Sequence, residues 1–276
     1  MRPARVLCCF AITIFLVAGA SSVSATDPLA RDASWTVPDV DQMEMRVRAS
    51  LDQMGVKPGE IDAVAKDFTD AVRRDDADAL EAFIAALDDM LPIVDRLVGL
   101  LRTDPVAAAS ELDPGTSTYA SLEAMPRPMR MSIRTWLGRE LVRERLYDEA
   151  LPVIAEVDPT ESIDPSAALF YRAVCYQALL MKKEALRDLR VLLENEDQMP
   201  RRYSRTAKLM IADIKPMKKD SLDEISRLMT DVTRRLDLGR SGERVKEREQ
   251  EIIDKLTKLI EKAEEEQKRQ QQQQQQ

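Results

Sequence analysis

The sequence predicts an all-α fold, an array of helical hairpins that ends in a long C-terminal helix. Glycine is scarce, with 8 residues in 276, and aromatic residues make up 4% of the chain. Alanine, leucine, methionine, glutamate, lysine and arginine are abundant, and their side chains lose little rotamer freedom in a helix. Apolar residues recur three and four positions apart, and small residues recur at longer fixed intervals.

The N-terminus has the three-part layout of a secretory signal peptide. Arg2 and Arg5 precede an apolar run from Val6 to Ala18, and small residues lead on to Ala25. The run is short for a membrane span, and no later stretch reaches the roughly 18 apolar residues that such a span needs. We therefore expect removal of residues 1–25, export to a bacterial periplasm or the exterior, and no transmembrane segment in the mature chain.

Charge and cysteine content restrict the possible partners and the source of stability. The chain has 41 basic and 49 acidic residues, a net charge of −8, and processing removes two of the arginines. A chain this acidic is a poor match for a phosphate backbone, so no nucleic-acid partner is expected. Processing leaves Cys175 as the one cysteine, which excludes an intramolecular disulfide. The single asparagine, Asn195, favours a bacterial source over a secreted eukaryotic one.

The N-terminal part of the chain divides at its prolines and polar stretches. Residues 26–38 form a polar lead-in, residues 39–103 a helical region and residues 104–128 a linker. Pro92 is expected to bend or split the third helix, because proline lacks an amide hydrogen and clashes with the preceding turn. The linker prediction comes from its Asp-Pro, Pro-Gly and Pro-Arg-Pro sequences.

Pairs of small residues recur in the stretch that follows. The pairs Gly138–Ala150 and Ala173–Ala185 are each separated by twelve residues, and Ala207 follows Ala173 by 34. This is the spacing of the small residues in tetratricopeptide repeats, whose paired helices approach closely only where both side chains are small. We therefore predict tetratricopeptide-like hairpins over residues 129–238, with an irregular helical bundle as the alternative.

The C-terminal segment has the pattern of a coiled coil. Over residues 243–269, Val245, Ile252 and Leu259 recur every seven positions, and the helix would be about 40 Å long at 1.5 Å per residue. The glutamine run of residues 270–276 is predicted to be disordered. An amphipathic helix alone cannot cover its own apolar stripe, so we expect a homodimer through residues 243–269, or else docking on the chain's own repeats.

Several short stretches carry a resemblance to a known family. They begin at Trp136 (Trp-Leu-Gly-Arg-Glu-Leu), Tyr147 (Tyr-Asp-Glu-Ala-Leu), Leu169 (Leu-Phe-Tyr-Arg-Ala-Val), Pro200 (Pro-Arg-Arg-Tyr) and Arg235 (Arg-Leu-Asp-Leu-Gly-Arg). Together they resemble an uncharacterised family of secreted bacterial helical-repeat proteins with glutamine-rich C-termini, over roughly residues 125–276. The resemblance implies a signal peptide and a helical array, and it implies no activity or site.

The residue types argue against catalysis. The chain has no histidine, which excludes Ser-His-Asp and Cys-His arrangements and histidine metal sites. Cys175 lies among apolar neighbours, so a buried inert thiol is expected. Adjacent acids such as Asp88 and Asp89 fall on helices without a calcium-loop pattern, and no glycine-rich phosphate loop occurs. We therefore expect a non-enzymatic protein with no catalytic, cofactor or metal site.

The repeat register does predict one binding surface. Residues at fixed offsets from Gly138, Ala173 and Ala207 would line the concave face, and the charged ones are all basic. The predicted binding residues are Arg139, Arg143, Gln177, Arg201 and Lys208, and Val174, Ala178 and Ser204 share the face with them. These basic residues have two interpretations. They are either ordinary solvated side chains, or they line a groove that binds a protein or an acidic peptide. The chain would then be an envelope adaptor, or alternatively a structural component assembled through its coiled coil.

The signal-peptide prediction has a direct test. We expect the mature protein to begin at Thr26, because Val23 and Ala25 are small enough for the processing enzyme. Intact-mass measurement of protein from the cell envelope checks this, and a mass that includes residues 1–25 would contradict it.

Overall fold

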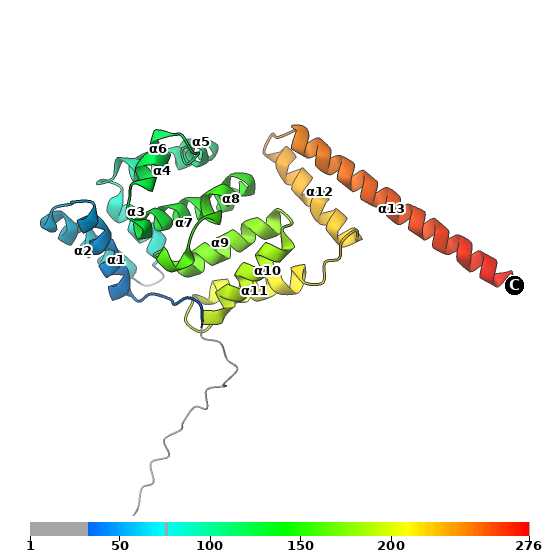
Figure 1. The fold of residues 1–276 in the computed structure, drawn as a ribbon, viewed down its shortest axis with the longest axis horizontal. Helices are drawn as coiled ribbons and strands as arrows, with labels where there is room; N and C mark the ends of the chain where they lie inside the picture. The colour runs from blue at the N-terminus through cyan, green and yellow to red at the C-terminus, as the bar shows by residue number, and fades with distance from the viewer. Residues whose placement is uncertain (1–32, 75–76, 276) are drawn as a thin grey trace, which may run out of the picture. The chain divides into compact units, whose positions relative to one another are not determined.

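Helices make up all the regular structure in the described part of the chain. The computed structural model describes residues 33–74 and 77–275, and within them it contains thirteen α-helices, two short 3-10 helices and no strand (Figure 1). The predicted all-α class with a long C-terminal helix is thereby confirmed. The predicted signal peptide, residues 1–25, and the first part of the lead-in lie outside the described residues.

The last residues of the lead-in are anchored to the array. Trp35 is buried, and its indole Nε1–H donates to the carbonyl of Val191 at 2.7 Å. The side-chain amide nitrogen of Asn195 donates to the backbone carbonyl of Trp35 at 2.5 Å. These paired groups tie the start of the described chain to a segment about 160 residues further on.

Four helices form the N-terminal region. They are α1 (Val40–Gln53), α2 (Pro58–Val72), α3 (Ala79–Leu87) and α4 (Pro92–Thr103). As expected, Pro92 splits the predicted third helix, because it occupies the first turn of α4, where a missing amide hydrogen costs nothing. The buried faces of these helices belong to the same apolar core as the helices that follow.

The prediction that residues 104–128 form a linker is wrong. It folds into α5 (Pro105–Ser110) and α6 (Ser117–Glu123), and it buries Ala108, Leu112 and Leu122. Asp104 and Thr116 cap the two helices by accepting amide hydrogens at 3.0 Å each. The Asp-Pro and Thr-Ser sequences therefore mark the starts of helices. Residues of these types are common in loops, but the same side chains also cap the first turn of a helix.

Five helices form the central array. They are α7 (Arg127–Arg143), α8 (Tyr147–Ala155), α9 (Pro165–Ala178), α10 (Lys182–Leu192) and α11 (Arg201–Ile214). Neighbouring helices in this series pack on one another, and α9 also packs on both α7 and α11. The alanines at the predicted crossing positions, Ala150, Ala173, Ala185 and Ala207, are fully buried. At Gly138 an added Cβ would lie 2.9 Å from the Cβ of Ile154, so α7 and α8 cross as closely as the spacing predicts.

Two turns of the array have the same geometry. Arg145 ends α7 with a left-handed φ of 61°, and Leu180, 35 residues later, ends α9 with a φ of 63°. In each case the next amide donates back to the carbonyl five residues before it, from Leu146 to Leu141 at 2.9 Å and from Met181 to Tyr176 at 2.7 Å. This pattern is the Schellman ending of a helix, and the same ending occurs at Gly55 after α1 and at Gly239 in the later part of the chain.

The C-terminal helices form a hairpin. The two helices are α12 (Leu222–Asp237) and α13 (Glu243–Gln274), joined through Gly239 with a left-handed φ of 71°. Lys255 of α13 pairs with Glu224 at the start of α12 at 2.8 Å, which shows that the helices run antiparallel. The helix continues through the glutamine run to Gln274, where a disordered tail over 270–276 was expected. Glutamine is a good helix former, and the helix simply propagates through it.

The apolar stripe of α13 is covered within the chain. Val245 and Ile252 pack against Ile225, Leu228 and Val232 of α12. This cluster is separate from the main core, which extends from Trp35 to Met210. The stripe that predicted a homodimer through residues 243–269 therefore has an intramolecular partner.

The close crossing of α7 and α8 can be tested by adding a methyl group. We expect Gly138→Ala to lower the free energy of unfolding by about 1–3 kcal/mol and Gly138→Leu by more, because Ile154 must move. Gly99 in α4 is the matched control, since nothing lies within 4 Å of its added Cβ and Gly99→Ala should stabilise the helix by about 0.5–1 kcal/mol. Urea denaturation followed by circular dichroism measures both. Equal effects at the two glycines would contradict the close crossing.

Candidate binding surface

The five residues predicted to line a groove do not share one open surface. Arg139 is buried, Gln177 is partly exposed, and Arg143 on α7 and Arg201 and Lys208 on α11 are exposed. Lys208 forms an ion pair with Glu196. The structure therefore covers one of these residues, Arg139, and places Gln177 on the wall of an open cleft.

Arg139 is enclosed by acidic residues of the chain itself. Its guanidinium pairs with Asp78 and Glu140, each at 2.7 Å, and with Glu81. Asp78 is also the N-cap of α3, where it accepts the amide hydrogens of Leu80 and Glu81 at 3.1 Å. Burial alone would lower the pKa of Arg139, and the carboxylates of Asp78 and Glu140 reverse this and raise it.

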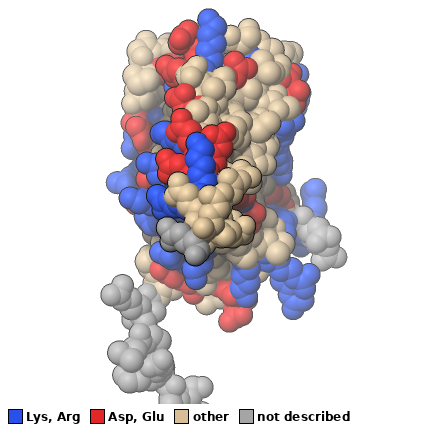
Figure 2. All heavy atoms as spheres, turned by 90° about the vertical axis from the view of Figure 1, so that its right-hand side faces the viewer, with Lys and Arg blue, Asp and Glu red and all other residues tan. Residues whose placement is uncertain are grey.

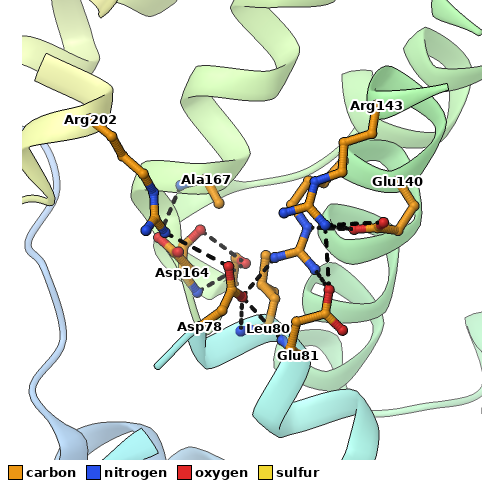
Figure 3. A network of polar contacts seen from close by, with 10 residues as sticks. Asp78, Leu80, Glu81, Glu140, Arg143, Asp164, Ala167 and Arg202 are labelled. Atoms are coloured by element: carbon orange, nitrogen blue, oxygen red, sulfur yellow. Dashed lines mark hydrogen bonds and ion pairs between the residues drawn. The ribbon is translucent and has the colours of Figure 1, made fainter. Parts of the chain in front are cut away.

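The network extends to the neighbouring helices. Arg143 pairs with Glu140 at 2.8 Å and with Glu81 at 3.5 Å, and Arg202 reaches Asp78 at 3.7 Å (Figure 3). Burial works against the charge of Asp78, but the adjacent guanidinium of Arg139 holds the pKa of this carboxyl below its ordinary value. Helices α3, α7 and α11 are thus joined by one set of charges of both signs.

The predicted groove is consequently occupied by α3 at Arg139, while Arg143 stays exposed beside Glu81 of α3. Phe83 and Leu87 of α3 are buried in the main core, so α3 cannot leave this position without exposing apolar surface. The basic face does bind an acidic helix end, as its charge suggested, but that helix belongs to the same chain. The sequence does contain the signal, because Asp78 and Glu81 stand at the capping and third positions of a predictable helix.

Gln177 lines a cleft that stays open. The cleft has a volume of about 400 Å³ and lies between the α8–α9 part of the array and α12. Val174 and Ala178, the other neighbours predicted for the groove, share this wall with Gln177. The Gln177 amide nitrogen donates to Asp213 at 3.1 Å, which fixes the side chain along the wall.

The cleft combines apolar walls with several arginines. Tyr147 and Leu180 add apolar surface, and the two equivalent turns at Arg145 and Leu180 form one rim. Arg145, Arg227 and Arg234 line the cleft, opposed by the single carboxylate of Asp231. Arg234 stacks over the ring of Tyr147 at 5.1 Å and pairs with Asp231 at 2.5 Å. The side chain of Arg145 is 54% exposed, which leaves it the most accessible of these charges.

A cluster of arginines attaches the C-terminal hairpin to the array. Asp148 of α8 pairs with Arg235 at 2.8 Å and with Arg234 at 3.1 Å, and Arg244 approaches it at 3.3 Å. Although burial opposes it, hydrogen bonds from Arg235 and Arg234 hold the pKa of Asp148 below its ordinary value. Sequence reasoning missed this joint, because Asp148 and its partners are more than 80 residues apart.

Further features of the described residues bear on chemistry. Cys175 is buried, and burial raises the pKa of its thiol to about 12, which makes it a poor nucleophile. No group of three or more His, Cys, Asp or Glu side chains in the described ranges is arranged to hold a metal ion. None of the helices in residues 33–74 and 77–275 is long and apolar enough to cross a membrane.

No family model, curated protein or solved structure matches this chain.

The buried guanidinium of Arg139 has a measurable role in stability. We expect Arg139→Met to destabilise the fold by roughly 3–5 kcal/mol, because it leaves the carboxylates of Asp78 and Glu140 without their buried partner. Arg201→Met on the exposed surface should change stability by less than about 0.5 kcal/mol. Because the folded-state pKa of Asp78 is lowered, the stabilisation is present above about pH 4 and is lost as the pH falls through that pKa. Denaturation curves for both variants at neutral and acidic pH check this, and a pH-independent difference would contradict it.

Proposed function

We propose that this protein is a non-enzymatic interaction module of the bacterial cell envelope that binds a segment of a protein partner in the cleft between α9 and α12. The cleft itself carries the proposal, since it is an open, partly apolar site with an accessible arginine at its rim. Export of the chain rests on the signal-peptide pattern of residues 1–25.

The lining of the cleft defines the chemistry of the partner. Val174, Ala178 and Leu180 offer apolar contacts, and three arginines face one carboxylate in a chain whose net charge is −8. A short segment with an apolar side chain next to an acidic one, or next to a C-terminal carboxylate, suits this combination. Arg145 would meet the carboxylate, because it is the most exposed of the three and its pairing with Asp237 is long, at 4.0 Å between exposed side chains, whereas Arg227 and Arg234 pair with aspartates at 2.9 and 2.5 Å.

The arrangement of the array supports a binding role. We interpret the hairpins α7–α8 and α9–α10 as tetratricopeptide-like, from the close crossing at Gly138 and the equivalent turns at Arg145 and Leu180. Stacked hairpins of this kind expose repeated surfaces along which an extended segment contacts several repeats in succession. The two turns at the rim of the cleft provide such a repeated surface.

The attachment of α12 keeps the cleft in a defined shape. Helix α12 belongs to an apolar cluster separate from the main core, and Leu180 of the array contributes a partly buried side chain to that cluster. Its other contacts with the array include ion pairs at Asp148 and Asp213, and the guanidinium of Arg234 lies over the ring of Tyr147. Arg234, Arg235 and Asp148 are only 4%, 7% and 11% exposed, and separating buried paired charges is costly, so the wall formed by α12 is already in place when a segment binds.

A second function is favoured by the C-terminal helix. From Glu261 onward the side chains of α13 are exposed as far as Gln275, so this part of the helix has no covering element among the described residues. The alternative proposal is a structural component of the envelope that is assembled through its C-terminal helices. In that case the array would act as a spacer and the cleft would have no ligand.

Site-specific photo-cross-linking in the envelope distinguishes the two proposals. A photoreactive residue in place of Ala178 should cross-link a defined partner, identified by mass spectrometry, whereas the same residue in place of Leu209, 70% exposed on α11, should not. Arg145→Glu should lower the cross-linking yield from position 178 several-fold, since it reverses the accessible charge at the rim. Equal yields from both positions, or no effect of the charge reversal, would argue against the cleft as the binding site.

A further inference from the structure

The hairpin of α12 and α13 has apolar side chains that it leaves exposed. In α12 these are Leu222, Met229 and Leu236, seven residues apart and 70%, 53% and 48% exposed. In α13, Ile253 and Ile260 are also seven apart and are 54% and 58% exposed. A seven-residue spacing keeps side chains directed toward a packed neighbouring helix. Each helix therefore has a second apolar row in addition to the row that faces its hairpin partner.

The two exposed rows lie on the same side of the hairpin. In α12, Met229 precedes the buried Val232 by three positions, and in α13, Ile253 precedes Leu256, which packs on α12, by three. A step of three residues is a rotation of about 300°, so each row is rotated by the same angle and in the same sense from its helix's line of contact. Because the helices are antiparallel, equal rotations bring both rows to one side. We call this side the outer face.

The outer face carries little charge, although 33% of the chain is charged. Thr233 and Thr257 lie beside the rows, and their hydroxyls donate to the carbonyls of Met229 and Ile253 at 3.0 and 2.9 Å. Both hydroxyls are therefore satisfied within their own helices, and covering the threonine methyl groups would strand no polar atom. Lys246, seven residues before Ile253, continues the row of α13, and Glu249 lies four residues before Ile253, so the two charges near the row have opposite signs. Figure 2 views the molecule from the side at which α13 ends, where clusters of basic and acidic side chains stand beside uncharged surface.

We propose that the outer face binds the outer face of a second copy of this chain, so that two hairpins form a four-helix bundle. A single partner helix in the groove between α12 and α13 would contact both rows along one line, whereas a second hairpin also matches both rows in width and in their seven-residue spacing. Two copies of a protein with a net charge of −8 repel each other, and repulsion is weakest where a face is close to neutral.

The size of the outer face sets the strength of the interaction. Over the 16 residues of α12 the face is about 24 Å long, and it is about 20 Å wide across two helices. Two such faces bury on the order of 1,000 Å² together, which is the lower end for a specific interface. We therefore expect a reversible dimer with a Kd in the micromolar range.

The interface is independent of the cleft, so the inference goes beyond the proposed function. The array contacts α12 through Arg227, Arg234 and Arg235, and none of these residues belongs to the exposed rows. Loss of dimerisation and loss of partner binding can therefore be separated by substitution.

Sedimentation velocity of the purified chain, from about 1 to 200 μM, tests the dimer across the micromolar range expected for a small interface. The wild-type protein should approach twice the monomer mass at the upper concentrations. Ile253→Glu and Met229→Glu each place a charge in the interface and should remain monomeric throughout, with unchanged circular dichroism. Their dimerisation should be weakened at least tenfold.

Two controls isolate the outer face. Leu209→Glu introduces the same charge at an exposed apolar residue of α11 and should dimerise like the wild type. Ala178→Trp fills the cleft and should also dimerise normally, even where it abolishes capture of a partner. A wild-type chain that stays monomeric at 200 μM, or an Ile253→Glu variant that dimerises normally, overturns the proposal. Capture of a different protein by the outer face of a monomeric chain overturns it as well.

Discussion

The buried guanidinium of Arg139 joins the two parts of the fold. A charge removed from water is stable only when it is paired and hydrogen-bonded, and Arg139 obtains its partners from α7 itself and from the first turn of α3. Its neighbour Gly138 permits α8 to approach on the adjoining side of α7. Two consecutive residues thus set the distance between the array helices and the position of the N-terminal region. The acidic end of α3 thereby pairs with the basic side chain that the sequence pattern assigned to an open groove.

The C-terminal hairpin is attached by different means. The N-terminal region shares the main apolar core with the array, whereas the hairpin has its own small cluster and reaches the array through arginines around Asp148. The paired side chains of this joint are themselves buried, with Arg234 4%, Arg235 7% and Asp148 11% exposed, so moving the hairpin would leave buried charges without partners. Paired charges thus hold the hairpin where apolar packing holds the N-terminal region, and the open cleft lies where the hairpin meets the array.

Much of this architecture follows from local sequence patterns. The spacing of Gly138 and Ala173 from the following small residues indicated the hairpins, and Pro92 marked the start of a helix, because both effects depend on a few neighbouring residues. The linker prediction over 104–128 failed because proline, aspartate and serine begin helices as well as loops, and only burial of Leu112 and Leu122 distinguishes the two. The groove prediction failed at Arg139 for a related reason. The repeat spacing predicts which residues share a face of the array. Whether that face is open depends on the pairing of Arg139 with Asp78, which lies 61 residues earlier in the sequence.

Helix α12 connects the proposed surfaces physically. One side of it forms a wall of the cleft, a second packs against α13, and a third carries the exposed row of Leu222, Met229 and Leu236. A second copy bound to the outer face would hold α12 between two packed neighbours, so the cleft wall formed by α12 would be more ordered than in a monomer. The protein itself would then lose less conformational entropy when a segment binds in the cleft. The residues that would face the second copy and those that line the cleft are different, so dimerisation and partner binding remain separable by substitution although both involve α12.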